Sequence, residues 1–273
     1  MSTVSTSVSD TTLKYSHLSA FLLHLVNFGV TEWQVRRTSD TAVQFVVNND
    51  YTQHRRKAED PHRNVPWGRW PAGELAPVFF LLSAVNHGWA YFDFPRYLHW
   101  VDVRRQNPVR YWEYALSAAC CTLILGQMSG ISNVRELLGL VTLNAVMQFS
   151  GWGAEKAVGD LKNVSLAWFF EGLGFLCLAG SLSVLLLAFG ASYPELSAEG
   201  TPDNLLPLVT SAIAVTYALY VVFGLVSVAY VRGADPTVQD GFRLTSFRQV
   251  ELWFLGLSWV AKTYLGYLVT FGT

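Results

Sequence analysis

A single lysine, Lys262, lies in the middle of an apolar stretch near the C-terminal end of the sequence, Phe247–Phe271. The stretch is long enough to cross a bilayer as a helix, which takes about 20 residues. A lysine at membrane depth costs roughly 2.5–3.5 kcal/mol, so it needs a partner or a chemical task. Snorkelling is disfavoured, because at about 1.5 Å per residue either end of the helix is more than about 10 Å away. A buried lysine amine can form a Schiff base with an aldehyde cofactor, and we expect this chemistry of Lys262.

Glu113 is the candidate partner for this cation. It belongs to the apolar run that opens as PVRYWEYALSAACC at Pro108, in which Arg110, Glu113 and Ser117 share one helical face. An intramembrane carboxylate needs a cation, and a protonated Schiff base on Lys262 would have Glu113 as its counterion. The alternative is an ion pair between Arg110 and Glu113 near the interface, with no cofactor. These residues alone leave both arrangements open.

Two histidines, His24 and His87, fall within predicted spans, and each has an amide neighbour, Asn27 or Asn86. Histidine is the side chain best suited to accept a proton near neutral pH. We expect His24 and His87 to lie at the depth of Glu113 and to form a polar, hydrated cavity. The alternative is that each is a satisfied polar residue packed between helices. We assign no role to the histidines near interfaces or in loops, which are His17, His54, His62 and His99.

Two further carboxylates, Glu171 and Glu251, also fall within apolar runs. Glu251 precedes Lys262 by about three helical turns, or about 16 Å along the helix. Both residues are candidates for stations of a proton relay. The alternative of equal weight is that each is a hydrogen-bond partner between neighbouring helices.

Aromatic residues recur in the middle of the predicted spans. A flat polyene needs apolar, aromatic walls, and such residues could supply them. Each residue taken singly is more often part of core packing. The candidates are Trp168, Phe169, Phe175, Tyr217, Tyr220, Phe223 and Trp259.

The composition indicates a membrane protein in which helices position these groups. The chain has 51% hydrophobic and 14% charged residues, whereas soluble proteins carry about 25% charged residues. Its net charge of −1 gives no reason to expect a nucleic-acid partner, and the cysteine spacing fits neither a zinc site nor a disulfide framework. We expect a disordered tail over residues 1–12 and one transmembrane domain over 13–273. Seven spans are predicted: Leu13–Thr31, Ala76–Phe92, Pro108–Met128, Asn133–Trp152, Asn163–Gly190, Leu205–Val231 and Phe247–Phe271.

The first connection, residues 31–75, is much longer than the others. Its two short runs TEWQVRR and TAVQFVVN predict a small β-hairpin that turns at Thr38–Asp40. A loop of this length in a compact protein is usually functional or a structured cap.

Basic residues predict the orientation in the membrane. Lysine and arginine concentrate in the second, fourth and sixth loops, whereas the third and fifth contain only Arg135, at a helix edge. The positive-inside rule then places the N-terminus in the cytoplasm and the C-terminus and first loop outside. The first loop is also basic, but its charges are mixed with acids and many lie far from a helix end, so we discount them. The sequon at Asn163 falls on the cytoplasmic side and is expected to be unused.

The sequence resembles the heliorhodopsins, a branch of the retinal-binding, seven-helix microbial rhodopsins. The resemblance rests on RYWEYALSA at 110–118, on SWVAK at 258–262, on His24 and His87, and on the long first loop. It covers essentially the whole chain. The implied fold is an all-α, rhodopsin-like bundle of seven transmembrane helices.

The resemblance also implies a chromophore site. All-trans retinal would be bound covalently to Lys262, with Glu113 as counterion and Ser117 and Ser258 close to the Schiff base. A cytoplasmic-side polar cavity would receive the photoreleased proton, and its members would be His24, His87, Asn27 and Arg110. The pocket walls would include Trp168, Tyr220, Phe223 and Trp259.

The sequence departs from the family pattern in three places. Glu171 stands where a small or neutral residue is expected beside the pocket. Asn27 stands where a longer amide is expected. The sixth predicted helix has no tryptophan, so we take Phe223 or Tyr220 as the aromatic residue that faces the ring.

We therefore expect a light-activated photoreceptor and not an enzyme, with no metal site. Its expected partners are the lipid bilayer, a second copy of the chain contacted in part through the first loop, and an unknown cytoplasmic signalling protein. The alternative is light-gated or light-driven proton transport through Glu113, Glu171 and Glu251. The absence of an obvious acid in the outer halves of the helices favours the photoreceptor, and the extra carboxylates favour transport. A third hypothesis is a retinal-free seven-helix receptor or transporter.

Overall fold

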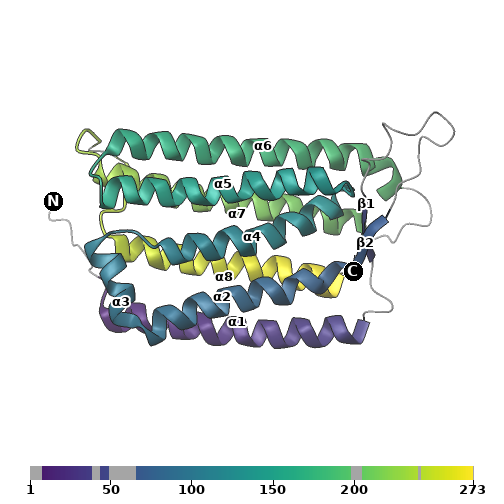
Figure 1. The fold of residues 1–273 in the computed structure, drawn as a ribbon, viewed down its shortest axis with the longest axis horizontal. Coiled ribbons are helices and arrows are strands. Elements are labelled where there is room, and N and C mark those ends of the chain that lie inside the picture. The colour runs from purple at the N-terminus through teal and green to yellow at the C-terminus, as the bar shows by residue number, and fades with distance from the viewer. Residues whose placement is uncertain (1–7, 39–43, 49–65, 198–204, 239–240, 273) are drawn as a thin grey trace.

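The structure is a computed structural model that describes residues 8–38, 44–48, 66–197, 205–238 and 241–272. Seven long helices run along one axis of the described part of the chain (Figure 1). They are α1 (Asp10–Thr38), α2 (Leu75–Phe92), α4 (Pro108–Met128), α5 (Val134–Gly159), α6 (Val164–Leu196), α7 (Leu205–Ala234) and α8 (Phe247–Gly272). A short helix, α3 (Phe94–Leu98), and a π-helical turn (His99–Val103) connect α2 to α4. A 3₁₀ turn (Ala72–Glu74) leads into α2.

The seven predicted spans are confirmed as helices, and several of them are longer than predicted. α1 begins at Asp10, inside the stretch that was predicted to be a disordered tail, because the Ser9 hydroxyl accepts a hydrogen bond from the Thr12 N–H at 3.0 Å. The fourth predicted helix, which we ended at Trp152, continues to Gly159. This extension brings a further acidic residue, Glu155, into the bundle.

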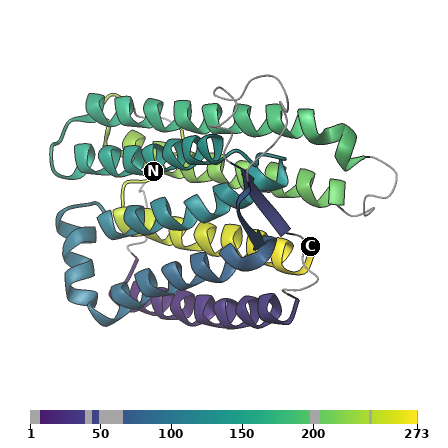
Figure 2. The ribbon, with the colours of Figure 1, turned by 45° about the vertical axis from the view of Figure 1, so that its right-hand side comes forward.

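The long helices form a closed ring. Each packs against the next along the chain, and α8 packs against both α7 and α1. Figures 1 and 2 show α4 and α8 between the layer of α5, α6 and α7 and the pair α1 and α2. The two helices that carry Glu113 and Lys262 therefore lie between these two groups of helices.

The two ends of the bundle differ. We call the end with α3 and the N-terminus the α3 end, and the opposite end, with the C-terminus and the two strands, the strand end (Figure 1). Each end has its own cluster of buried apolar residues. One contains Phe79, Ile124 and Leu265, and the other contains Tyr97 and Phe254. Buried polar side chains of α2, α4 and α8 lie between the two clusters in sequence.

The predicted hairpin is wrong in its pairing. Its first run, TEWQVRR, forms the last turns of α1. Its second run contains β1 (Gln44–Asn48), which pairs antiparallel with β2 (Pro66–Pro71), with Gln44 opposite Pro71. Residue 40, in the predicted turn, lies outside the described residues. The helical hydrogen bonds continue from the preceding span and override the weak strand propensity of the first run.

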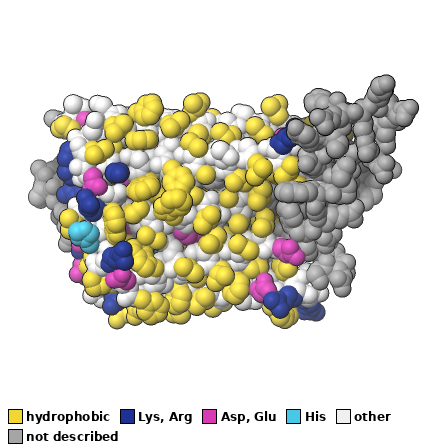
Figure 3. Space-filling model, viewed as in Figure 1, with side chains coloured by type: hydrophobic (Ala, Val, Ile, Leu, Met, Phe, Trp, Pro, Cys, Tyr) yellow, Lys and Arg dark blue, Asp and Glu magenta, His cyan; other side chains and the backbone are white. Residues whose placement is uncertain are grey.

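The outer surface is apolar over most of its length. Figure 3 shows hydrophobic side chains across the middle of one face, with lysine and arginine gathered toward the ends. Within the described residues, three helices, α2, α6 and α7, are long and apolar enough to cross a membrane by length and composition. A surface of this kind fits a protein surrounded by lipid. Large apolar side chains that are exposed include Leu22, Val85, Leu116, Leu187, Leu225 and Trp259.

Candidate functional site

Lys262 projects into the ring from the middle of α8. Its Nζ lies 2.7 Å from Glu113 Oε1 and 2.6 Å from Ser83 Oγ. The Ser83 hydroxyl accepts from Lys262, and its own hydrogen faces Glu113 Oε1 at 2.8 Å or the Phe79 carbonyl at 2.9 Å. The predicted ion pair between Lys262 and Glu113 is therefore present.

The ion pair between Lys262 and Glu113 is buried, so each residue needs the charge of the other. Lys262 and Glu113 are each 6% exposed, and Ser83 is fully buried. Neither charge would be tolerated alone at this depth, so each depends on the other. Sequence reasoning did not identify Ser83. Its position one helical turn before His87, on the same face of α2, was the available signal.

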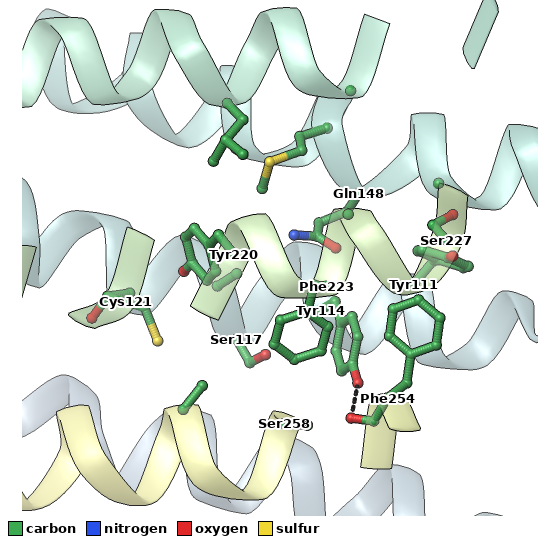
Figure 4. A pocket seen from close by; sticks show the side chains of 18 of the residues that line it. Tyr111, Tyr114, Ser117, Cys121, Gln148, Tyr220, Phe223, Ser227, Phe254 and Ser258 are labelled. Carbon is green, nitrogen blue, oxygen red and sulfur yellow. Dashed lines mark hydrogen bonds between the residues drawn. The ribbon is translucent and has the colours of Figure 1, made fainter. Parts of the chain in front are cut away.

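A pocket with about 880 Å³ of empty space, counting its open mouth, extends from Lys262 between α4, α5, α6, α7 and α8. Figure 4 shows Tyr114, Phe223 and Phe254 grouped beside the pocket, with the Tyr114 hydroxyl donating to the Phe254 carbonyl at 3.1 Å. The Phe223 and Phe254 rings stack with centroids 5.7 Å apart.

The pocket wall matches the predicted wall only in part. Tyr220 and Phe223 line it, as do Ser117 and Ser258 (Figure 4). Phe254 was missed, although it lies one turn before Ser258 and two turns before Lys262 on the same face of α8.

Two predicted wall residues, Trp168 and Trp259, do not line the pocket. Trp259 is 41% exposed on the outer surface, because it follows Ser258 directly and is turned about 100° away from the inward face. Trp168 lies near the beginning of α6, where its Nε1 donates to Asp235 Oδ2 at 3.2 Å. Asp235 follows the end of α7, and hydrogen bonds from Thr237 hold the pKa of its carboxyl below the ordinary value.

The pocket suits a conjugated ligand attached to Lys262. Its wall is largely aromatic and aliphatic, and a single lysine borders it within the part of the chain that the structure describes. Ser117 Oγ and Glu113 Oε2 are buried without a hydrogen-bond partner among the described residues. Two polar atoms near Lys262 are therefore available to a group at its nitrogen.

The histidines predicted to form a cavity pack together with a third imidazole. His24 and His87 are buried, and their rings are parallel to within 2° with centroids 5.5 Å apart. His17 Nδ1 lies 3.0 Å from His87 Nδ1. His17, which was assigned no role from the sequence, is 3% exposed and belongs to the same cluster. Its spacing of about two helical turns from His24, which places both on one face of α1, could have revealed it.

Asn27 contacts α8 instead of the histidines. Its Nδ2 donates to Thr263 Oγ1 at 3.1 Å, and its Oδ1 accepts from the Tyr267 hydroxyl at 3.2 Å. Both ring nitrogens of His24 lack a hydrogen-bond partner in the described part of the chain. Asn27 therefore lies on the strand side of the cavity to which it was assigned and joins α1 to α8.

Arg110 lies in a separate cluster at the α3 end. Its guanidinium forms ion pairs with both Glu155 and Glu251, so the alternative pairing of Arg110 with Glu113 is wrong. Asn107 caps α4 by accepting from the Arg110 N–H at 3.2 Å, and its Nδ2 donates to Glu251 at 2.8 Å. The assignment of Arg110 to the histidine cavity is corrected accordingly, because its charge is engaged by these two carboxylates.

Two tyrosines complete this charged cluster. The Tyr111 hydroxyl donates to Glu155 Oε1 at 2.9 Å, and the Tyr97 hydroxyl donates to Glu251 Oε2 at 2.9 Å. Glu251, proposed from sequence as a relay or a hydrogen-bond partner, is thus held in an ion pair and two hydrogen bonds. Sequence reasoning missed Glu155, because it ended the fourth helix about two turns too early.

Glu171 lines the same pocket as Lys262 from α6. It is 7% exposed and accepts a 2.5 Å hydrogen bond from the Ser227 hydroxyl on α7. Both the relay and the helix-to-helix hydrogen bond that the sequence suggested are compatible with this position. Among the described residues, no group of three His, Cys, Asp or Glu side chains could hold a metal ion.

The Arg110 cluster is expected to contribute strongly to stability. Arg110→Ala should destabilise the protein by about 3–5 kcal/mol, because it leaves Glu155 and Glu251 buried without a cation. Arg104→Ala is the matched control, since Arg104 is 48% exposed in its pair with Asp160 and should cost less than about 1 kcal/mol. Thermal unfolding in detergent, followed by circular dichroism, measures both. Equal losses from the two variants would contradict a structural role for the cluster.

The comparisons with known proteins agree with this architecture. A sequence model of the family described as heliorhodopsin matches residues 14–273. Among proteins of curated function, none matches the sequence. A light-driven proton pump from Leptosphaeria maculans is similar in structure, with a TM-score of 0.65, 13% identity, and coverage of 97% of this chain and 96% of that one. Exiguobacterium sibiricum rhodopsin gives a TM-score of 0.62 at 12% identity, with coverage of 95% and 94%. At such low identity the two structures establish the fold alone.

Proposed function

This chain belongs to the heliorhodopsin family, and from that membership and the geometry of the site we propose that it is a light-activated photoreceptor with retinal on Lys262. The observation that carries the proposal is the position of Lys262 Nζ, which borders a largely apolar pocket 2.7 Å from the Glu113 carboxylate. The proposal includes no enzymatic reaction.

When bound through an imine to Lys262, retinal, which we expect to be all-trans in the dark, supplies visible absorbance and a light-driven isomerisation. Tyr220, Phe223 and Phe254 supply the apolar wall of the pocket. Glu113 places a negative charge beside the lysine nitrogen, and Ser83 fixes its orientation through a hydrogen bond. Ser117 and Ser258 place hydroxyl groups at the same part of the pocket.

We propose that the proton released from Lys262 Nζ after illumination moves to the histidine cavity. Ser83 and His87 lie one turn apart on α2, so the path from the lysine nitrogen to His87 follows one helix face. The ring nitrogens of His24, which have no hydrogen-bond partner among the described residues, support this destination. The Arg110 cluster at the α3 end is occupied by its own ion pairs.

Flash photolysis of the purified protein with all-trans retinal tests this function. We expect a protonated visible band that is converted transiently to a blue-shifted, deprotonated species, and a slow return in the dark. A pH-sensitive dye in the medium should report little proton release while that species exists, because the proton stays on His24 or His87. Rapid stoichiometric release into the medium would contradict the cavity as the destination.

We propose that the α3 end faces the cytoplasm. Lysine and arginine gather there, as Figure 3 shows at the left-hand end, and the positive-inside rule places such residues inside. The N-terminus is then cytoplasmic and the C-terminus extracellular. The basic residues in the connections and helix ends at the α3 end are Arg96, Arg104, Arg105, Lys156, Lys162, Arg232, Arg243 and Arg248.

We further propose that the protein is a homodimer in the bilayer and passes its signal to a cytoplasmic protein. The family resemblance supports the dimer, and the cytoplasmic placement of the α3 end supports a partner on that side. Light scattering of the detergent-solubilised protein measures the mass of the assembly.

Proton transport is the second candidate function, and Glu171 favours it. This carboxyl group lines the pocket from α6 and is bonded to Ser227, on a side of Lys262 that the histidines do not occupy. If protons cross the membrane through the pocket, a voltage-clamped cell should show a steady light-evoked current that Glu171→Gln reduces by about tenfold or more. Glu136→Gln, at an exposed helix start, should leave the current unchanged. We expect no steady current, and its presence would contradict a purely sensory function.

A further inference from the structure

His17 has a contact that the proposed path does not use. Its Nδ1 lies 3.0 Å from His87 Nδ1, and its side chain is as deeply buried as those of His24 and His87. His24 contacts the same His87 ring by stacking, without an in-plane hydrogen bond. Of the two histidines on α1, His17 is therefore the one that is hydrogen-bonded to His87.

A nitrogen-to-nitrogen hydrogen bond restricts the protonation of the two rings. One of the two Nδ1 atoms must carry the hydrogen and the other must accept it. Two imidazolium rings in this position would point two hydrogens at each other. The pair can therefore hold one additional proton but not two.

We propose that His17 is a further proton-holding residue of the cavity, which shares with His87 the proton that leaves Lys262. This inference rests on the proposed function. With Nδ1–H of His87 donating to His17, a proton that binds His87 Nε2 makes that ring an imidazolium. The Nδ1 hydrogen then passes to His17 Nδ1, so His87 returns to the neutral form and His17 carries the charge. One proton moves, and no other reactant is required.

One carboxylate, Glu251, lies behind His17 on the side of Tyr97. The rings of His17 and Tyr97 form a T-shaped contact, with centroids 4.6 Å apart at 73°. The Tyr97 hydroxyl donates to Glu251, whose charge is shared with Arg110. A proton on His17 is thus separated from Lys262 by the His87 ring, and it lies nearer to the Glu251 carboxylate than a proton on His87. Separation from the lysine nitrogen should slow the return of the proton.

His17→Asn tests the proposal, because asparagine keeps a polar group toward His87 but cannot hold a proton. In flash photolysis the deprotonated species should form in both proteins and decay about tenfold faster in the variant, since the proton can no longer move on to His17, away from the lysine nitrogen. His99→Asn, at an exposed histidine in the π-helical turn, should decay at the wild-type rate. An unchanged decay in His17→Asn would overturn the proposal. If that variant fails to fold, His17→Gln replaces it.

A second measurement needs no light. In ¹⁵N-histidine NMR spectra of the full chain in darkness, with and without retinal, a coupling across the hydrogen bond should join two histidine nitrogens. It should vanish in His17→Asn and persist in His24→Asn. Absence of the coupling in the wild-type protein would show that His17 and His87 are not hydrogen-bonded and would overturn the proposal. If the proposed function itself were wrong, the wild-type protein would form no deprotonated species after illumination. The proposal of a shared proton would then be wrong as well, and this result differs from an unchanged decay in His17→Asn.

Discussion

Lys262→Ala is expected to abolish the visible absorption band of the protein mixed with retinal. Within the part of the chain that the structure describes, Lys262 is the single lysine that borders the pocket, so no other amine there could form the imine. Free retinal absorbs in the near ultraviolet, and its spectrum is all that should remain. This measurement also decides the retinal-free hypothesis, which would gain support from a wild-type protein without a visible band.

Alanine also removes the cation beside Glu113, so a stable comparison is needed. Lys262→Arg keeps a positive charge beside Glu113 but should give no band, because arginine does not form an imine at neutral pH. Lys156→Ala, at an exposed lysine in the last turn of α5, should keep the full band. A visible band in either Lys262 variant would exclude this residue as the attachment site.

Glu113→Gln is expected to have the second largest effect. Opposite charges about 4 Å apart or less attract by at least about 4 kcal/mol at an effective dielectric constant of about 20, a factor of about a thousand in an equilibrium. Loss of the carboxylate therefore either leaves the imine nitrogen deprotonated at neutral pH, with absorbance in the near ultraviolet, or shifts the visible band markedly. Absorbance spectra recorded over a pH series distinguish these two results.

Two controls define the specificity of this effect. Ser83→Ala should shift the band less, because it removes a hydrogen bond to Glu113 and keeps the charge. Glu155→Gln removes a carboxylate that Arg110 engages, and it should affect stability more than colour. A spectrum of Glu113→Gln identical to that of the wild type would remove Glu113 from the counterion role.

The fold was largely predictable from the sequence. Apolar runs of spanning length identified the seven long helices, because a backbone in lipid must satisfy its hydrogen bonds within each segment. The helix ends were less predictable, as at Gly159, since the last turns are stabilised by contacts with other helices. The strand pairing of Gln44–Asn48 with Pro66–Pro71 joins segments distant in sequence, and no local pattern specified it.

The sequence by itself determined that Lys262, deep in an apolar span, needs an opposite charge, and it offered Glu113 as the partner while leaving a pair between Arg110 and Glu113 open. Only the tertiary structure decided where the remaining charges go. Arg110 lies one turn from Glu113 on α4, yet Glu155 of α5 and Glu251 of α8 approach it more closely. The same holds for His17, whose partner His87 comes from α2. Helical periodicity specifies which residues share a face, but the packing of the ring specifies which faces meet, and that depends on the side chains of all seven helices at once.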